Sequence, residues 1–138
     1  MKITVLGAGS WGTALSMTLW KNGHSVYLWT HDEKEAKYLE EKRKCMNLPD
    51  VVIPKEIAIL TSLEEAVKEG EVLVYAVPSI FTRSMGERTR AFVRKEQILV
   101  TVSKGIEEST LYTMTDILEE FFPENKIAVL SGPSHAEE

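Results

Sequence analysis

Short apolar segments alternate with amphipathic segments along this chain of 138 residues. Runs rich in Val, Ile and Leu predict β-strands at 2–6, 25–29, 57–60, 71–77, 97–102 and 126–130. Between them, helical spacing of apolar residues, together with capping signals, predicts helices at 11–21, 32–43, 62–70, 79–94 and 111–122. Strand and helix therefore alternate from one end of the chain to the other.

This alternation determines the expected fold class. The first strand, at 2–6, is apolar almost throughout, which is typical of a parallel strand covered on both faces. Neighbouring parallel strands need crossover connections, and the intervening helices supply them, so we expect an α/β protein with a doubly wound parallel sheet. Ligands of such sheets bind at the loops that follow the carboxyl ends of the strands. Those loops are expected at 7–12, 30–32, 77–83, 103–107 and 131–135.

Composition and charge argue against several functional classes. The length matches one domain. The net charge of −5 and the scattered Lys and Arg residues argue against a nucleic-acid partner. Cys45 is the only cysteine, so no internal disulfide can form and a reducing, cytoplasmic location is expected. No apolar run reaches the ~20 residues of a membrane span, and no His, Cys and acidic residues have the spacing of metal ligands.

The turn after the first strand reads GAGSWG at positions 7–12. In this pattern Gly7 permits a tight turn, Gly9 lets a pyrophosphate approach the backbone, and Gly12 lets the helix pack closely on the strand. The helix that begins near Ser10 would present unpaired N–H groups and its positive dipole end to phosphate. Because the motif joins a buried strand to an amphipathic helix, it predicts a Rossmann-type dinucleotide site.

The end of the second strand leaves the choice between NAD and NADP open. An acidic residue about 20 positions beyond the glycines would accept the ribose hydroxyls of NAD. Asp32 is available for this role, but Asp32 and Glu35 also have the spacing of a capping box that begins the next helix. His31 could donate a hydrogen bond to a 2′-phosphate, or it could simply face solvent.

Four motifs together resemble one family. The segments GAGSWGTAL, AVPS, VSKGIE and SGPSHAEE, in this order, resemble those of the NAD(P)-dependent glycerol-3-phosphate dehydrogenases. The segment LPDVVIP at 48–54 is similar to a loop of that family, although Asp50 stands where glycine is usual. The chain also departs from the family's usual residues at Lys44, Asn47 and His31. The departure at His31 leaves a preference for NADP in doubt.

The resemblance implies roles for residues near the amino end of the chain. Ser10 and Trp11 match partners of the cofactor pyrophosphate, although Trp11 could instead be a core residue. Phe81 matches an aromatic residue beside the nicotinamide half of the cofactor, and its alternative is again a place in the core.

Further roles fall in the last two loops. Lys104 matches a lysine that binds both cofactor and substrate, where its ammonium would act as an electrostatic stabiliser; the alternative is an ordinary exposed lysine. Gly132 and Ser134 match contacts to glycerol phosphate, and Ala136 matches a contact to the cofactor. A simple turn between strand and helix would explain the same residues.

The resemblance also implies a larger enzyme. Members of the family interconvert sn-glycerol 3-phosphate and dihydroxyacetone phosphate by hydride transfer, which feeds phospholipid synthesis, and they form homodimers. Their helical second domain supplies the general base. We therefore expect residues 1–138 to be the NAD(P)-binding domain of a longer enzyme, without that helical domain. The alternatives are another enzyme of the 6-phosphogluconate-dehydrogenase-like group and a non-catalytic NAD(H)-sensing module.

Overall fold

The computed structural model of the chain describes residues 1–45 and 50–131. Within these residues, six strands form one parallel sheet in the order β3-β2-β1-β4-β5-β6. The strands are β1 (Lys2–Leu6), β2 (Ser25–Trp29), β3 (Ala58–Leu60), β4 (Val72–Tyr75), β5 (Ile98–Thr101) and β6 (Lys126–Val129). This order confirms the predicted doubly wound sheet, because the chain runs outward from β1 in one direction and then returns to add β4 on its other side.

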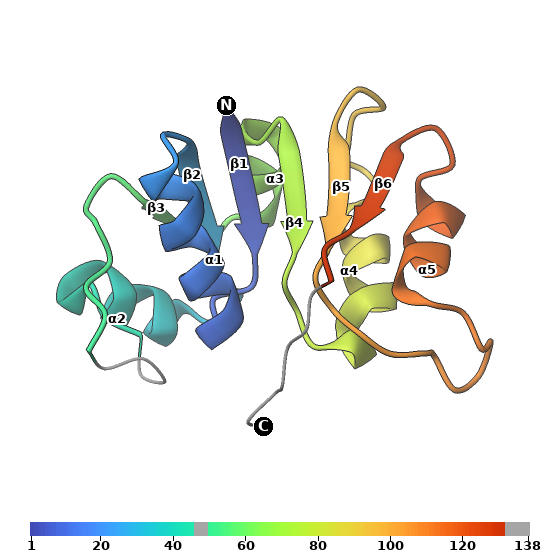
Figure 1. Cartoon of the computed structure of the whole chain (residues 1–138), viewed down its shortest axis with the longest axis horizontal. Helices are drawn as coiled ribbons and strands as arrows, with labels where there is room; N and C mark the ends of the chain where they lie inside the picture. Colours follow the sequence, from blue (N-terminus) through green and yellow to red (C-terminus); the bar gives the residue numbers. More distant parts are fainter. Residues whose placement is uncertain (46–49, 132–138) are drawn as a thin grey trace.

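Helices cover both faces of the sheet (Figure 1). They are α1 (Ser10–Lys21), α2 (Glu33–Lys42), α3 (Leu63–Glu69), α4 (Thr82–Thr89) and α5 (Met114–Phe121), with a short 3-10 helix η1 (Ser79–Phe81) before α4. Helices α1 and α2 lie over one face of the β1–β3 half, whereas α3, α4 and α5 lie behind the sheet in the view of Figure 1. Two apolar cores result, one on each face.

Helix α1 packs on the sheet through small side chains. Its buried residues are Gly12, Thr13 and Ser16, and the hydroxyl of Ser16 donates to the Gly12 carbonyl at 2.7 Å. Trp11 is 57% exposed, so the interpretation of Trp11 as a core residue is wrong. Small residues on the buried face allow the helix axis to approach the strands closely, and larger apolar residues such as Leu15 lie half-buried at its flank.

Two glycines of the first turn are required by its geometry. Gly7 has a φ of +125°, a conformation that L side chains rarely adopt, and a Cβ there would lie 2.5 Å from the carbonyl oxygen of Ala76. A Cβ at Gly12 would lie 1.8 Å from the carbonyl oxygen of Gly7. The backbone of α1 therefore touches the backbone of the preceding turn, as the motif predicted.

Two predicted helices have different bounds in the structure. Helix α4 ends at Thr89, because residues 90–97 form turns in which the Gln97 side chain accepts from the Arg94 N–H at 2.7 Å. Helix α5 begins at Met114, after a capping box formed by Thr113 and Asp116. Leu111, expected on the buried stripe of this helix, instead lies in the preceding loop with a φ of +63°.

The contact between Gly12 and Gly7 predicts a large effect of one added methyl group. Gly12→Ala should destabilise the domain by about 3 kcal/mol or more, because the clash is with backbone that cannot rotate away. Gly9→Ala is the control: its Cβ would meet no described atom within 4 Å, and the change should cost at most about 1 kcal/mol. Urea unfolding followed by circular dichroism measures both, and equal midpoints for the two variants would contradict the packing described here.

Candidate functional site

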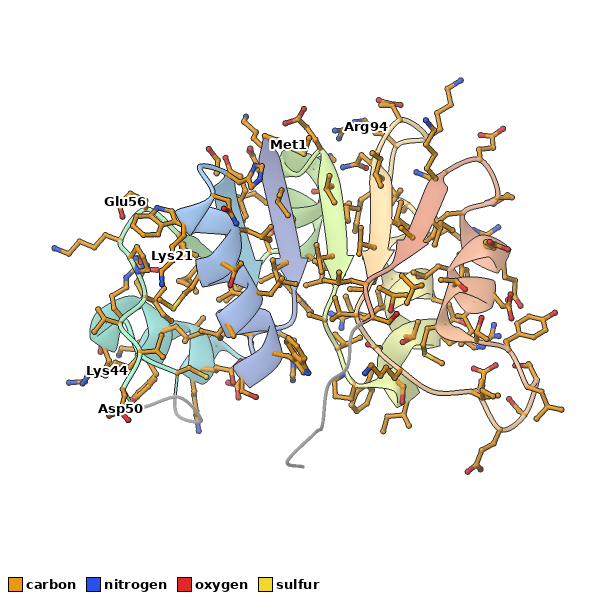
Figure 2. All side chains as sticks on the ribbon, viewed as in Figure 1. Met1, Lys21, Lys44, Asp50, Glu56 and Arg94 are labelled. Atoms are coloured by element: carbon orange, nitrogen blue, oxygen red, sulfur yellow. The ribbon has the colours of Figure 1, made fainter. Side chains whose placement is uncertain are left out.

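The functional loops gather at the carboxyl ends of the strands. Met1 and Arg94 lie at the opposite edge, where the strands begin (Figure 2). Strand β1 lies between β2 and β4, so the turn after β1 is flanked by the loops that follow those two strands. In open α/β sheets, this position between the two halves is where ligands bind.

A cavity of about 490 Å³ opens at this position. It is bounded by the glycine turn, the end of β2, the loop after β4 and one side of α4. The lining residues are Gly7, Ala8, Gly9, Trp29, Thr30, His31, Glu35, Ala76, Val77, Pro78, Phe81, Ser84, Met85 and Arg88. Of the residues predicted from the sequence, Gly7, Gly9, His31 and Phe81 therefore line one cavity. Its size is within the range of cavities that hold small ligands or parts of cofactors.

The amino end of α1 meets this cavity without a side-chain cap. Gly9 is the N-cap residue, and no side chain of the described residues accepts a hydrogen bond from the first turn. By contrast, Asp32, Ser62 and Thr113 cap helices α2, α3 and α5. The space beside Gly9 is open, since a Cβ there would have no described neighbour within 4 Å. Uncapped N–H groups beside open space form a suitable site for an anion.

At the end of β2, Asp32 has the capping role that was one of its two expected roles. The Asp32 carboxylate accepts from the N–H groups of Lys34 and Glu35, at 2.8 and 3.3 Å, so Asp32 is the N-cap of α2. His31 is exposed and lines the cavity. Thr30 is buried, and its hydroxyl donates to a carboxylate oxygen of Glu35 at 2.6 Å.

The loops after β4 and β5 lie side by side. Phe81 is 49% exposed and lines the cavity, so the alternative that placed it in the core is wrong. Lys104 lies in the loop after β5, exposed, next to Ser103, whose hydroxyl donates to the carbonyl of Val77 in the loop after β4. This hydrogen bond ties the Lys104 loop to the segment that carries Phe81.

An ion-pair network also holds the Lys104 loop in place. The Arg83 guanidinium on α4 donates to both oxygens of Glu107 at 2.8 and 2.9 Å, and to Glu120 on α5 at 2.6 Å. Thr110 adds a hydroxyl donor to Glu107 at 2.6 Å. The hydrogen bonds from Arg83 and then from Thr110 lower the pKa of Glu107 from 4.5 to about 2.

Other predicted residues fall outside this arrangement or outside the described residues. Gly12 packs against Gly7 rather than lining the cavity, and Ser10 and Trp11 form the first turn of α1 beside it. Three positions with predicted roles, Gly132, Ser134 and Ala136, lie outside the described residues 1–45 and 50–131, and so does Asn47.

The cavity is also lined by three polar residues, Thr30, Glu35 and Arg88, that had no individual role in the sequence analysis. In the sequence, Thr30 only follows the end of a predicted strand, and Glu35 only marks the start of a predicted helix. Nothing in the sequence distinguished Arg88. Arg88 reaches the cavity because its guanidinium lies over the Trp29 ring, 5.4 Å from the ring centroid. Among the described residues, no group of three or more His, Cys, Asp or Glu is placed to hold a metal ion. No described helix has the length and apolar character needed to cross a membrane.

Comparison with known proteins places the chain in a family. Residues 2–138 match the family model described as the N-terminus of NAD-dependent glycerol-3-phosphate dehydrogenase. The chain belongs to this family. It is 49% identical over 138 residues to a glycerol-3-phosphate dehydrogenase [NAD(P)+] of Agathobacter rectalis, and 47% identical over 141 residues to one of Fusobacterium nucleatum.

These relatives are longer than the chain. The matches cover 99% and 100% of the chain but only 41% and 42% of the two relatives. The crystal structure of glycerol-3-phosphate dehydrogenase from Coxiella burnetii superposes with a TM-score of 0.88 at 23% identity, over 96% of this chain and 41% of that one. The shared part has the same fold as the six-stranded sheet described above.

The Glu107 ion pair predicts a defined pH dependence of stability. The folded protein keeps Glu107 ionised down to pH about 2, whereas the unfolded chain protonates it near 4.5. The stabilisation is therefore complete above pH 4.5 and is lost as the pH falls from 4.5 toward 2. Glu107→Gln should lower stability at pH 6 and lose less stability between pH 5 and 3 than the wild type. Urea unfolding midpoints measure this.

Glu108→Gln is the matched control, because Glu108 is the exposed neighbour of Glu107. It should keep the pH dependence of the wild type. The same acid sensitivity in Glu107→Gln and in the wild type would show that the ion pair with Arg83 does not stabilise the fold.

Proposed function

We propose that residues 1–138 bind NAD or NADP as the cofactor domain of a glycerol-3-phosphate dehydrogenase. One observation carries the proposal: the uncapped amino end of α1 faces open space at Gly9, at the wall of a cavity of about 490 Å³. Membership of the family supports the same proposal. The alternative is another enzyme of the 6-phosphogluconate-dehydrogenase-like group. Such an enzyme would share the fold, but it would not account for the match to the family model.

The residues present fit a dinucleotide. The N–H groups of the first turn of α1, from Ser10 onward, would hold the pyrophosphate, and Gly9 would leave room for it. The end of β2, with His31, would face the adenosine half, and Phe81 would face the nicotinamide half. When bound, the nicotinamide supplies the acceptor or donor of a hydride.

Lys104 would position the substrate in the full-length enzyme. Its ammonium follows β5 on a loop fixed by Ser103 and by the Arg83–Glu107 pair, and it would stabilise negative charge on glycerol 3-phosphate or dihydroxyacetone phosphate. Gly132 and Ser134 would complete the substrate contacts, and Ala136 would contact the cofactor. The general base would come from the part of the enzyme beyond these 138 residues.

We extend the proposal to the location, assembly and metabolic role of the full-length enzyme. We place the full-length protein in the cytoplasm as a homodimer, acting in the supply of glycerol 3-phosphate for phospholipid synthesis. The net charge of −5 gives no support for a nucleic-acid partner.

Cofactor binding by the 138-residue chain is the first test. Saturating NADH should raise the melting temperature and shift the NMR signals of the amides at positions 9–12, because these N–H groups would contact the pyrophosphate. Gly9→Ala should weaken NADH binding on the order of tenfold, while leaving the fold intact, because its methyl group would occupy the space for the phosphates.

Asn22→Ala is a control far from the cavity, at the other end of α1, and should bind NADH as the wild type does. No thermal protection by NADH or NADPH, together with unchanged amides at 9–12, would overturn the proposed cofactor site.

The second test is turnover. Mixed with dihydroxyacetone phosphate and NADH, the 138-residue chain should oxidise little or no cofactor, because a positioning lysine without a general base cannot move the hydroxyl proton. Glycerol 3-phosphate should nevertheless tighten NADH binding if the Lys104 loop contacts substrate, and Lys104→Met should abolish that effect. An affinity for NADH that is unchanged by glycerol 3-phosphate would instead favour the alternative of a non-catalytic NAD(H)-sensing module.

A further inference from the structure

A carboxylate lies at the cavity wall where β2 ends, and it belongs to Glu35 rather than to Asp32. Glu35 is in the first turn of α2, and its side chain lines the cavity together with Thr30 and His31. The Thr30 hydroxyl donates to Glu35 Oε1 at 2.6 Å and accepts from the Asp32 N–H at 3.3 Å. A short chain of hydrogen bonds therefore links the backbone at the strand end to the Glu35 carboxylate.

This arrangement differs from an ordinary capping box. In such a box the acidic residue at the third helical position would return to the N–H of the cap residue. Here that N–H, on Asp32, donates to Thr30 instead, and the Glu35 carboxylate accepts from the Thr30 hydroxyl. Thr30 is only 2% exposed and gives its single hydroxyl proton to Glu35, so the carboxylate is anchored at the strand end.

The charge of Glu35 is not neutralised within the described residues, where it forms no ion pair. Asp32 is not among the residues that line the cavity, and its Oδ1 accepts two N–H groups of α2, whereas Glu35 lines the cavity. The cation that lines the same cavity, Arg88, comes from α4 and lies over the Trp29 ring.

The register of the sheet puts this carboxylate near the expected ribose position. Leu6 pairs with Trp29, and the Gly7 N–H donates to the Trp29 carbonyl at 3.0 Å, so Thr30 follows directly beside the glycine turn. In dinucleotide-binding sheets, the adenosine ribose lies between that turn and the end of the second strand, where an acidic residue accepts its hydroxyls.

We propose that Glu35, anchored by Thr30, is the specificity-determining residue that makes this chain prefer NAD(H) to NADP(H). The proposal rests on the proposed cofactor site. The carboxylate accepts a hydrogen bond from the 2′-hydroxyl of NAD(H). The 2′-phosphate of NADP(H) meets a like charge at the same place and cannot donate a hydrogen bond to it.

Calorimetric titration of the 138-residue chain with NADH and with NADPH tests this preference. The wild type should bind NADH at least about tenfold more tightly than NADPH. Glu35→Gln keeps an acceptor for Thr30 but removes the charge, so it should reduce the preference about tenfold, mainly by tightening NADPH binding. Glu33→Gln, which makes the same change of net charge on the exposed first turn of α2, should leave the ratio of affinities unchanged within about twofold.

The outcomes separate this inference from the proposed function. Binding of both cofactors with equal affinity, or an unchanged ratio in Glu35→Gln, would overturn the role of Glu35 while leaving the cofactor site in place. Preferential NADPH binding that Arg88→Met abolishes would overturn it as well, by showing that the 2′-phosphate is held from α4. Failure of both cofactors to bind would overturn the proposed function and this inference together.

Discussion

The architecture depends on the direct backbone contact between the start of α1 and the turn that precedes it. Any side chain at Gly12 would occupy the position of the Gly7 carbonyl oxygen, so the helix can lie this close only because that residue has no Cβ. The small residues Thr13 and Ser16 continue the close approach along the buried face of α1. The amino end of α1 is thereby held at the edge of the sheet, directed at the cavity.

Gly7 fixes the turn from both sides. Its N–H donates to the carbonyl of Trp29 on β2, and the space where a side chain would lie is filled by the carbonyl of Ala76 after β4. The turn is thus in contact with the two strand ends that supply most of the cavity wall. In the proposed site, the end of β2 would face the adenosine half of the cofactor, and the loops after β4 and β5 would face the nicotinamide half. Hydrogen bonds of Arg83 and Ser103 tie these last two loops together.

The fold was largely predictable because strand and helix alternate and the glycine motif stands between the first two. The bounds were less predictable: Leu111 has an apolar side chain at helical spacing, but the capping box at Thr113 begins the helix three residues later. Of the site, Gly9 and Phe81 were predictable from motifs. The position of the Glu35 carboxylate was not predictable, because its spacing from Asp32 indicates a helix cap, and only the tertiary structure shows that this carboxylate accepts from Thr30 instead.

The strand order has a consequence for how the chain reaches this structure. Strand β1 is joined to β4 across a long stretch of sequence, and Lys2 donates to Glu71, 69 positions away. Closing so long a loop costs conformational entropy that local contacts do not, so this pairing is expected to slow folding relative to a fold of local contacts. The ligand edge is assembled across this pair of strands, so the cavity exists only when the two halves of the chain have paired.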